Sequence, residues 1–179
     1  FRPKASGHYL SAGGTEDVDL VEVDGDRNGV AGLEARGVLL GQDHAQHLTA
    51  ELVGRFVAER RALPAIALTT NQAILTAWSN DYAFEDVFAR QVEALGVAGD
   101  VAWGISTSGT SPNVVRGLRC ARERGLSTIG LTGAGGGAVA EFSDVLLAVP
   151  LTETARIQEV HLVTYHAVCA ALEKRIIAS

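Results

Sequence analysis

Hydrophobic residues repeat with the period of a helix in some stretches of this chain and form short unbroken runs in others. In residues 44–61 the apolar side chains of Ala45, Leu48 and Leu52 recur every three or four positions, which is typical of a helix with one buried face. Further helical patterns cover residues 71–81, 85–95, 114–125, 138–142 and 156–177. Apolar runs typical of buried strands cover residues 63–69, 101–105, 127–132 and 144–149.

Strands that alternate with helices in this way predict an α/β fold. We therefore expect a three-layer sandwich of the flavodoxin-like kind, in which a central parallel sheet lies between two layers of helices. Ligands bind to such sheets at the carboxyl ends of the strands. Residues 1–43 fit the pattern poorly, because glycine, aspartate and valine dominate them. We expect one domain over residues 44–179, preceded by an atypical N-terminal segment.

The most informative stretch runs from residue 100 to residue 115, where an apolar run leads into a hydroxyl-rich turn and then into a helical pattern. The hydroxyl groups belong to Ser106, Thr107, Ser108, Thr110 and Ser111. Pro112 suits the first turn of a helix, and Ser111 occupies the N-cap position before it. Because the first N–H groups of a helix are unpaired and lie at the positive end of its dipole, this turn predicts a phosphate site. The alternative is a polar loop with an ordinary helix cap.

Composition and charge argue against several classes of protein. The chain has 179 residues, a length that fits one domain. Its net charge of −6 argues against the basic surface that is typical of nucleic-acid binding. No run of about 18 apolar residues and no signal peptide is visible, so we expect a cytoplasmic protein without a membrane span. Cys120 and Cys169 fall in apolar helical patterns and are expected to be buried free thiols. The glycines at 133–137 lack the GxGxxG spacing of a dinucleotide site.

Four side chains that could bind a divalent metal ion come from two predicted helices. His47 and Glu51 are four residues apart and therefore share one helix face. Gln158 and His166 are eight residues apart and also lie close to one face. Together they form a mixed set of nitrogen and oxygen donors of the kind that zinc accepts. Spacing alone does not separate this reading from a solvated helix surface, where such pairs are common.

Two further histidines and three arginines lie near these residues in the sequence. His44 and His161 are interpreted as surface or structural histidines. Arg55, Arg60 and Arg61 form a small basic cluster, which is interpreted as a solvated face.

Several motifs in order give the chain a resemblance to the SIS (sugar isomerase) domains, and within them to the sedoheptulose-7-phosphate isomerases, also called phosphoheptose isomerases. The resemblance covers about three quarters of the chain, from residue 45 to the C-terminus. Besides the hydroxyl-rich loop, the matching pieces are Ala-Gln-His-Leu-Thr-Ala-Glu-Leu-Val-Gly-Arg-Phe at 45–56, Leu-Pro-Ala-Ile-Ala-Leu-Thr-Thr at 63–70, Asn-Asp-Tyr at 80–82, Phe-Ala-Arg-Gln-Val-Glu-Ala-Leu-Gly at 88–96, Gly-Leu-Thr-Gly at 130–133 and Arg-Ile-Gln-Glu-Val-His at 156–161.

The resemblance implies an activity and a set of site residues. The activity is the conversion of sedoheptulose 7-phosphate to D-glycero-D-manno-heptose 7-phosphate for heptose biosynthesis, by a homotetramer with shared active sites. Glu51 and His166 would be the acid–base pair, which moves protons between carbon and oxygen. One zinc ion per subunit would be held by His47, Glu51, Gln158 and His166. The substrate-binding residues would be Asn80, Asp81, Ser106, Thr107, Ser108, Ser111, Gln158 and Glu51.

One part of the family pattern is missing. The family has a Gly-Asn-Gly-Gly-Ser loop after its first strand, and the equivalent here would be Gly-Val-Leu-Leu-Gly at 37–41. Either the chain binds the anion differently at this point, or its N-terminal segment is altered, for instance by a shifted reading frame. The loss also favours the alternative function, a non-catalytic SIS module that binds a sugar phosphate or a protein. Retention of Glu51 and His166 favours the enzyme.

Overall fold

The computed structural model describes residues 35–41 and 43–178, in which five parallel strands form one sheet in the order β2-β1-β3-β4-β5. The strands are β1 (Gly37–Leu40), β2 (Ala65–Ala67), β3 (Val101–Ser106), β4 (Ser127–Thr132) and β5 (Val145–Ala148). Leu39 of β1 pairs with Ala67 on one side and with Trp103 on the other. The predicted α/β fold with a parallel sheet is confirmed.

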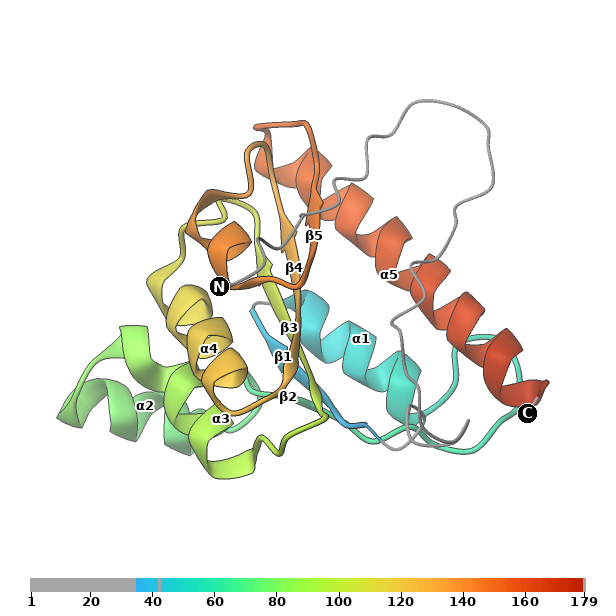
Figure 1. The fold of residues 1–179 in the computed structure, drawn as a ribbon, viewed down its shortest axis with the longest axis horizontal. Helices are drawn as coiled ribbons and strands as arrows, with labels where there is room; N and C mark the ends of the chain where they lie inside the picture. The colour runs from blue at the N-terminus through green and yellow to red at the C-terminus, as the bar shows by residue number, and fades with distance from the viewer. Residues whose placement is uncertain (1–34, 42, 179) are drawn as a thin grey trace, which may run out of the picture.

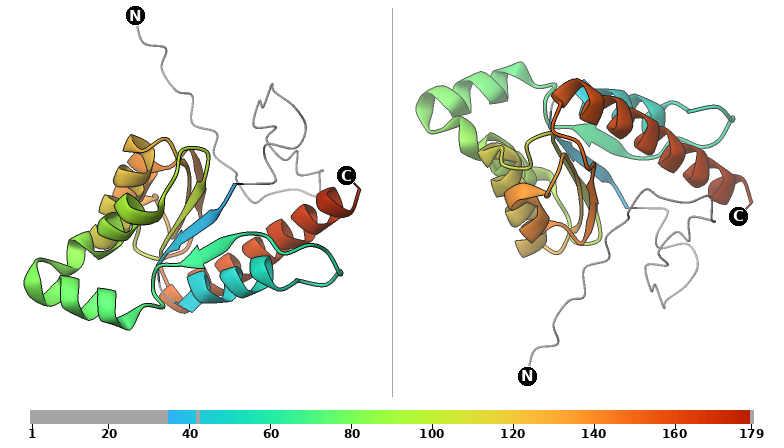
Figure 2. Two further views of the ribbon diagram at one scale, coloured as in Figure 1. Left: turned by 90° about the horizontal axis from the view of Figure 1, so that it is seen from below. Right: turned by 90° about the horizontal axis from the view of Figure 1, so that it is seen from above.

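Helices cover both faces of this sheet, as Figures 1 and 2 show. They are α1 (Asp43–Val53), α2 (Gln72–Asp81), α3 (Val87–Leu95), α4 (Pro112–Glu123) and α5 (Thr154–Ile177), with 3-10 turns η2 (Phe84–Asp86) and η3 (Gly137–Phe142). Leu39 belongs to the core under α1 and α5, whereas Val38 and Leu40 belong to the core under α3 and α4. Successive residues of β1 therefore point into two cores, which is the period of a strand between two helical layers. No helix of the described part is long and apolar enough to cross a membrane.

The first strand is the clearest difference from the sequence analysis. The equivalence of residues 37–41 with the family's polar loop is wrong, because Gly37–Leu40 form β1 and the side chains of Val38, Leu39 and Leu40 are fully buried. A four-residue apolar run is too short to show a period, so the pattern did not reveal it. The folded domain therefore includes residues before 44. Residues 1–34 of the predicted N-terminal segment lie outside the described residues.

Helix α1 ends earlier than predicted, at Val53 rather than at residue 61. Arg60 from the following loop turns back and donates hydrogen bonds to the backbone carbonyls of Glu51 at 2.6 Å and Leu52 at 2.9 Å. These bonds satisfy carbonyls that the helix end leaves unpaired. The Arg60 side chain is only 2% exposed and its Nε lies 3.5 Å from the Glu173 carboxylate of α5. The interpretation of Arg60 as a solvated residue is wrong.

The order of the strands defines where a ligand should bind. The chain passes from β1 to β2 on one side and later adds β3 on the other side of β1, so the direction of winding reverses between β1 and β3. Open α/β sheets bind ligands beyond the strand ends at such a point. Only residues 41 and 42 separate β1 from α1. Gly41 has a φ of 130°, and a Cβ there would lie 2.6 Å from the Ile105 carbonyl oxygen, so the connection runs tightly against β3.

Candidate functional site

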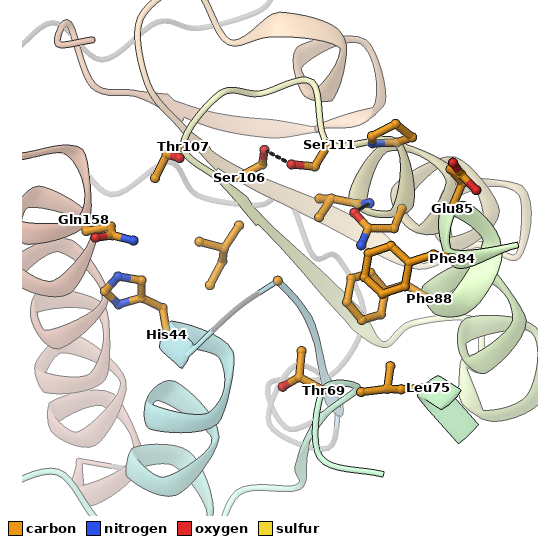
Figure 3. A pocket seen from close by; sticks show the side chains of 15 residues that line it. His44, Thr69, Leu75, Phe84, Glu85, Phe88, Ser106, Thr107, Ser111 and Gln158 are labelled. Carbon is orange, nitrogen blue, oxygen red and sulfur yellow. Dashed lines mark hydrogen bonds between the residues drawn. The ribbon is translucent and has the colours of Figure 1, made fainter. Parts of the chain in front are cut away.

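A pocket of about 410 Å³ opens where β1 and β3 end. Figure 3 shows Ser106, Thr107 and Ser111 along one side of it, with His44 and Gln158 lying together and Phe84 and Phe88 opposite them. The pocket therefore combines apolar walls with a few convergent polar groups, which is typical of a small-molecule site. It lies at the place where the strand order predicts a ligand.

The hydroxyl-rich loop after β3 forms a compact turn before α4. The Ser106 and Ser111 hydroxyl oxygens lie 2.8 Å apart, and Ser106, Thr107 and Ser111 all line the pocket. Gly109 has a φ of 67°, and a Cβ there would collide with the Gly136 carbonyl oxygen, so the loop packs closely against the glycines that follow β4. This places three hydroxyls beside the N-terminus of a 12-residue helix. The arrangement suits an anion such as a phosphate.

Two loop hydroxyls form hydrogen bonds within the turn, and the predicted helix cap by the Ser111 side chain is wrong. Ser111 is at the N-cap position, but among the described residues its side chain makes no capping hydrogen bond and bonds to Ser106 instead. Its hydroxyl is thus directed to the pocket side of the turn. The Ser108 hydroxyl accepts hydrogen bonds from the Thr110 backbone and side chain at 3.2 and 3.1 Å. Ser108 is exposed and is not one of the described residues that line the pocket.

His47, Glu51 and His166 come together although α1 and α5 are far apart in the sequence. Each offers a ligand atom within 4.8 Å of the other two, and His47 Nε2 lies 3.1 Å from a Glu51 carboxylate oxygen. The Nε2 atom of His166 is buried and has no hydrogen-bond partner in the described part of the chain. Two imidazoles and a carboxylate are the donors of a three-residue zinc site. An unpaired buried nitrogen beside two such donors therefore fits a bound cation.

The place of Gln158 among the ligands of the ion stays a prediction. Gln158 precedes His166 by eight residues on α5, which is two helical turns or about 12 Å along the axis. Gln158 lines the pocket with His44 and Thr107 (Figure 3).

Tyr165 links the pocket to the group of three. Its hydroxyl oxygen lies 2.9 Å from His47 Nδ1 and 3.3 Å from His44 Nδ1. Burial, with a smaller contribution from the negative charges of Cys169 and Glu51, raises the pKa of Tyr165 to about 12. The phenol therefore stays neutral and can both donate and accept a hydrogen bond. Tyr165 could not be recognised from the sequence, because a tyrosine in a helical apolar pattern is usually a core residue.

Two other titratable side chains of α5 are buried and have structural surroundings. The ring of His161 is fully buried and donates from Nε2 to the Thr132 carbonyl oxygen at 3.1 Å. Burial lowers the pKa of His161, so the ring is neutral in the fold. Burial also raises the pKa of Cys169 to about 11. Cys120 and Cys169 are both free thiols, as predicted, although Cys120 is only partly buried.

Asn80 and Asp81 lie at the end of α2 and are exposed. Among the described residues that line the pocket, this region contributes Leu75, Phe84 and Glu85 instead. Neither side chain is among the described residues that line the pocket, and their role in substrate binding stays a prediction.

Comparison with known proteins first defines the class of this one. The sequence pattern described as "SIS domain" matches residues 41–133, about half of the chain. The match includes the pocket-lining loop after β3 and the α1 residues of the metal-binding group. The chain is therefore a SIS domain protein.

Similar proteins show which family of SIS domain proteins the chain belongs to. The phosphoheptose isomerase of Synechocystis sp. is 58% identical over 134 residues, which cover 75% of this chain and 69% of the relative. That of Geotalea daltonii is 59% identical over 132 residues, covering 74% and 69%. The solved structure of phosphoheptose isomerase GmhA from Neisseria gonorrhoeae matches with a TM-score of 0.75 and 44% identity, covering 81% of this chain and 80% of that one. The chain belongs to the phosphoheptose isomerase family.

Proposed function

We propose that this chain is an aldose–ketose isomerase that converts sedoheptulose 7-phosphate to D-glycero-D-manno-heptose 7-phosphate through an enediolate. The observation that carries the proposal is a phosphate-type loop at the carboxyl ends of β1 and β3, together with a separate His–Glu–His group between α1 and α5. In an open-chain heptose 7-phosphate, the phosphate and the reacting carbonyl region lie at opposite ends of the carbon chain. Such a substrate needs both kinds of group, separated in space.

The spacing of residues along α1 supports two separate regions, one for the phosphate and one for the reacting carbonyl. His44 lines the pocket, and His47 and Glu51 follow it on the next two turns, about 4.5 and 10 Å further along the helix axis. The phosphate is proposed to bind Ser106, Thr107, Ser111 and the first N–H groups of α4. The sugar chain would then extend past His44 and Gln158 towards Glu51. Gln158 lines the pocket and is proposed to contact the sugar there.

Glu51 is the proposed base and His166 the proposed acid. Isomerisation removes a hydrogen from the carbon beside the carbonyl and moves protons between two oxygens. The Glu51 side chain is only 20% exposed, and its contact with His47 Nε2 holds it at one orientation. His166 lies in the same group, and its role as the acid is the one that the family resemblance implies.

Zinc is the proposed cofactor, held by His47, Glu51 and His166, with Gln158 as the further ligand that the family resemblance implies. When bound, it would polarise the substrate carbonyl as a Lewis acid. The Arg60 guanidinium bonds to the Glu51 backbone and so fixes the end of α1 that carries one of these ligands. Arg60 is in turn bound to α5, the helix that carries His166.

The proposal includes assembly and location. We propose a cytoplasmic homotetramer that serves heptose biosynthesis, as the family resemblance implies. Val53 on α1 and Val163 on α5 are 45% and 67% exposed, and association would remove this apolar surface from water. Light scattering at micromolar concentration tests the tetramer, and a monomer would contradict it.

Turnover of sedoheptulose 7-phosphate in a coupled assay tests the function directly. We expect the purified protein to be active, to lose activity after treatment with a chelator and to regain it when zinc is added. Full activity after exhaustive chelation would contradict the zinc site. Binding of the sugar phosphate by zinc-loaded protein without any turnover would favour the non-catalytic module instead.

The phosphate loop is tested by Ser106→Ala. A hydrogen bond to a charged group contributes about 1.5–3 kcal/mol, so the affinity for the sugar phosphate should fall roughly 10- to 100-fold. Affinity for the unphosphorylated sugar should change little. Ser108→Ala is the comparison within the same loop, and a smaller effect is expected because the Ser108 hydroxyl bonds to Thr110. Equal losses for phosphorylated and unphosphorylated sugar, measured by calorimetry, would remove the phosphate assignment.

A further inference from the structure

The hydroxyl of Tyr165 lies between two histidines that have different surroundings. His47 belongs to the proposed zinc site, whereas His44 lines the substrate pocket. Tyr165 is fully buried, and its oxygen is 2.9 Å from Nδ1 of His47 and 3.3 Å from Nδ1 of His44. The rings of His44 and His47 meet the tyrosine ring edge-on, with centroids 5.7 and 5.4 Å away. The proposed reaction leaves this bridge without a role.

We propose that Tyr165 is a positioning residue that holds His47 in the form able to bind the ion and, through the same hydroxyl, sets which nitrogen of His44 carries its hydrogen. The inference rests on the proposed zinc site. It concerns which nitrogen of each ring carries the hydrogen.

The direction of the hydrogen bonds follows from the number of available hydrogens. A neutral imidazole has one N–H and one bare nitrogen, and the phenol has one O–H. His47 presents Nε2 to Glu51 and His166, so a bound ion requires this nitrogen to be bare and the hydrogen to sit on Nδ1. Nδ1–H then donates to the Tyr165 oxygen. The Tyr165 O–H is left to donate to His44 Nδ1.

The same count determines the state of His44. With its Nδ1 accepting from Tyr165, the hydrogen of the neutral ring is on Nε2. His44, which lines the pocket, therefore carries its hydrogen on Nε2 when the ion is bound. If both hydrogen bonds of the Tyr165 hydroxyl ran in the opposite direction, the hydrogen of His47 would be on Nε2, where it would exclude the ion. Ion binding and the position of the hydrogen on His44 are thus coupled through one hydroxyl.

Tyr165→Phe removes the hydroxyl and keeps the ring that fills the core. Loss of the group that orients a metal-binding histidine usually lowers metal affinity by about 10- to 100-fold, and we expect this loss for zinc. Thr164→Val is the matched control, because it removes the adjacent hydroxyl of α5, which bonds to the Val160 carbonyl of the same helix. Its zinc affinity should stay within about twofold of wild type. Competition with a coloured chelator measures all three affinities, and circular dichroism checks the fold.

Imidazole nitrogen NMR gives a readout that does not depend on activity. On adding zinc to the wild-type protein, we expect Nδ1 of His47 and Nε2 of His44 to be the protonated nitrogens. In Tyr165→Phe the His44 ring should no longer respond to zinc. If wild-type protein binds zinc but Tyr165→Phe binds it equally well, or if zinc leaves His44 unchanged in the wild type, the inference is overturned while the zinc site stands. If the wild type binds no zinc, the proposed site and this inference fall together.

Discussion

Glu51→Gln is expected to lower the turnover of sedoheptulose 7-phosphate by about 10²- to 10⁴-fold, the usual contribution of a general base. Glu51 Oε1 lies 3.1 Å from His47 Nε2. The amide of Gln has the shape of the carboxylate and can keep this contact, so the fold should persist. It cannot accept a proton from carbon, and it removes the negative charge from the proposed zinc site. Steady-state kinetics and metal content should be measured together on the same preparation.

The matched control is Glu59→Gln. Glu59 lies in the loop after α1, and its side chain is 89% exposed in an ion pair with Arg55. Exposed pairs of this kind contribute little, so activity and stability should match those of the wild type. Activity near the wild-type level in Glu51→Gln would show that Glu51 is not the base. The chain would then be better interpreted as a binding module or as an enzyme of another kind.

Glu173→Ala is expected to destabilise the protein by about 3–5 kcal/mol, the usual result of breaking a buried ion pair. The Glu173 carboxylate accepts hydrogen bonds from the backbone N–H groups of Phe56 at 2.7 Å, Val57 at 3.0 Å and Ala58 at 2.9 Å. It also faces the buried guanidinium of Arg60. The substitution leaves these donors without their acceptor and the cation without its partner. Urea unfolding followed by circular dichroism measures the loss.

The comparison for this effect is Glu159→Ala on the same helix. Glu159 forms an exposed pair with Arg156, so its removal should change the free energy of unfolding by less than about 1 kcal/mol. If Glu173→Ala lowered the free energy of unfolding as little as Glu159→Ala does, the loop after α1 would not be held by the Glu173 carboxylate. A large loss would also explain any fall in activity, because the same loop supports the Glu51 end of α1.

Glu173 also gives the stability a dependence on pH. Burial by itself would raise the pKa of its carboxyl, but the three backbone donors and Arg60 outweigh it and lower the pKa below the ordinary value of 4.5. The folded state therefore favours the charged form, and this stabilisation is complete above pH 4.5 and is lost as the pH falls through the lowered value. The stability difference between wild type and Glu173→Gln should accordingly shrink below pH 4.5.

Features that depend on neighbours in the chain could be predicted from the order of residues. The alternation of helical and strand patterns indicated a parallel sheet between helices, and the strand–hydroxyl–proline order at 101–112 placed a turn before a helix. His47 and Glu51 could be paired because a helix brings residues four apart together on one face. The strand at 37–40 was missed because its run is so short, and because its pairing with β2 and β3 joins segments that are distant in the sequence.

Features that depend on contacts between distant elements could not be predicted in this way. His166 joins His47 and Glu51 because α5 packs beside α1, whereas Gln158, on the same helix, lies two turns away at the pocket. Tyr165 reads as a core residue until its hydroxyl is seen between two histidines of α1. Arg60 and Glu173 read as surface charges until the fold buries them against each other. Periodicity reports which face of an element is buried, but a partner is chosen by how the elements pack around the sheet, and that arrangement brings together residues more than 100 positions apart.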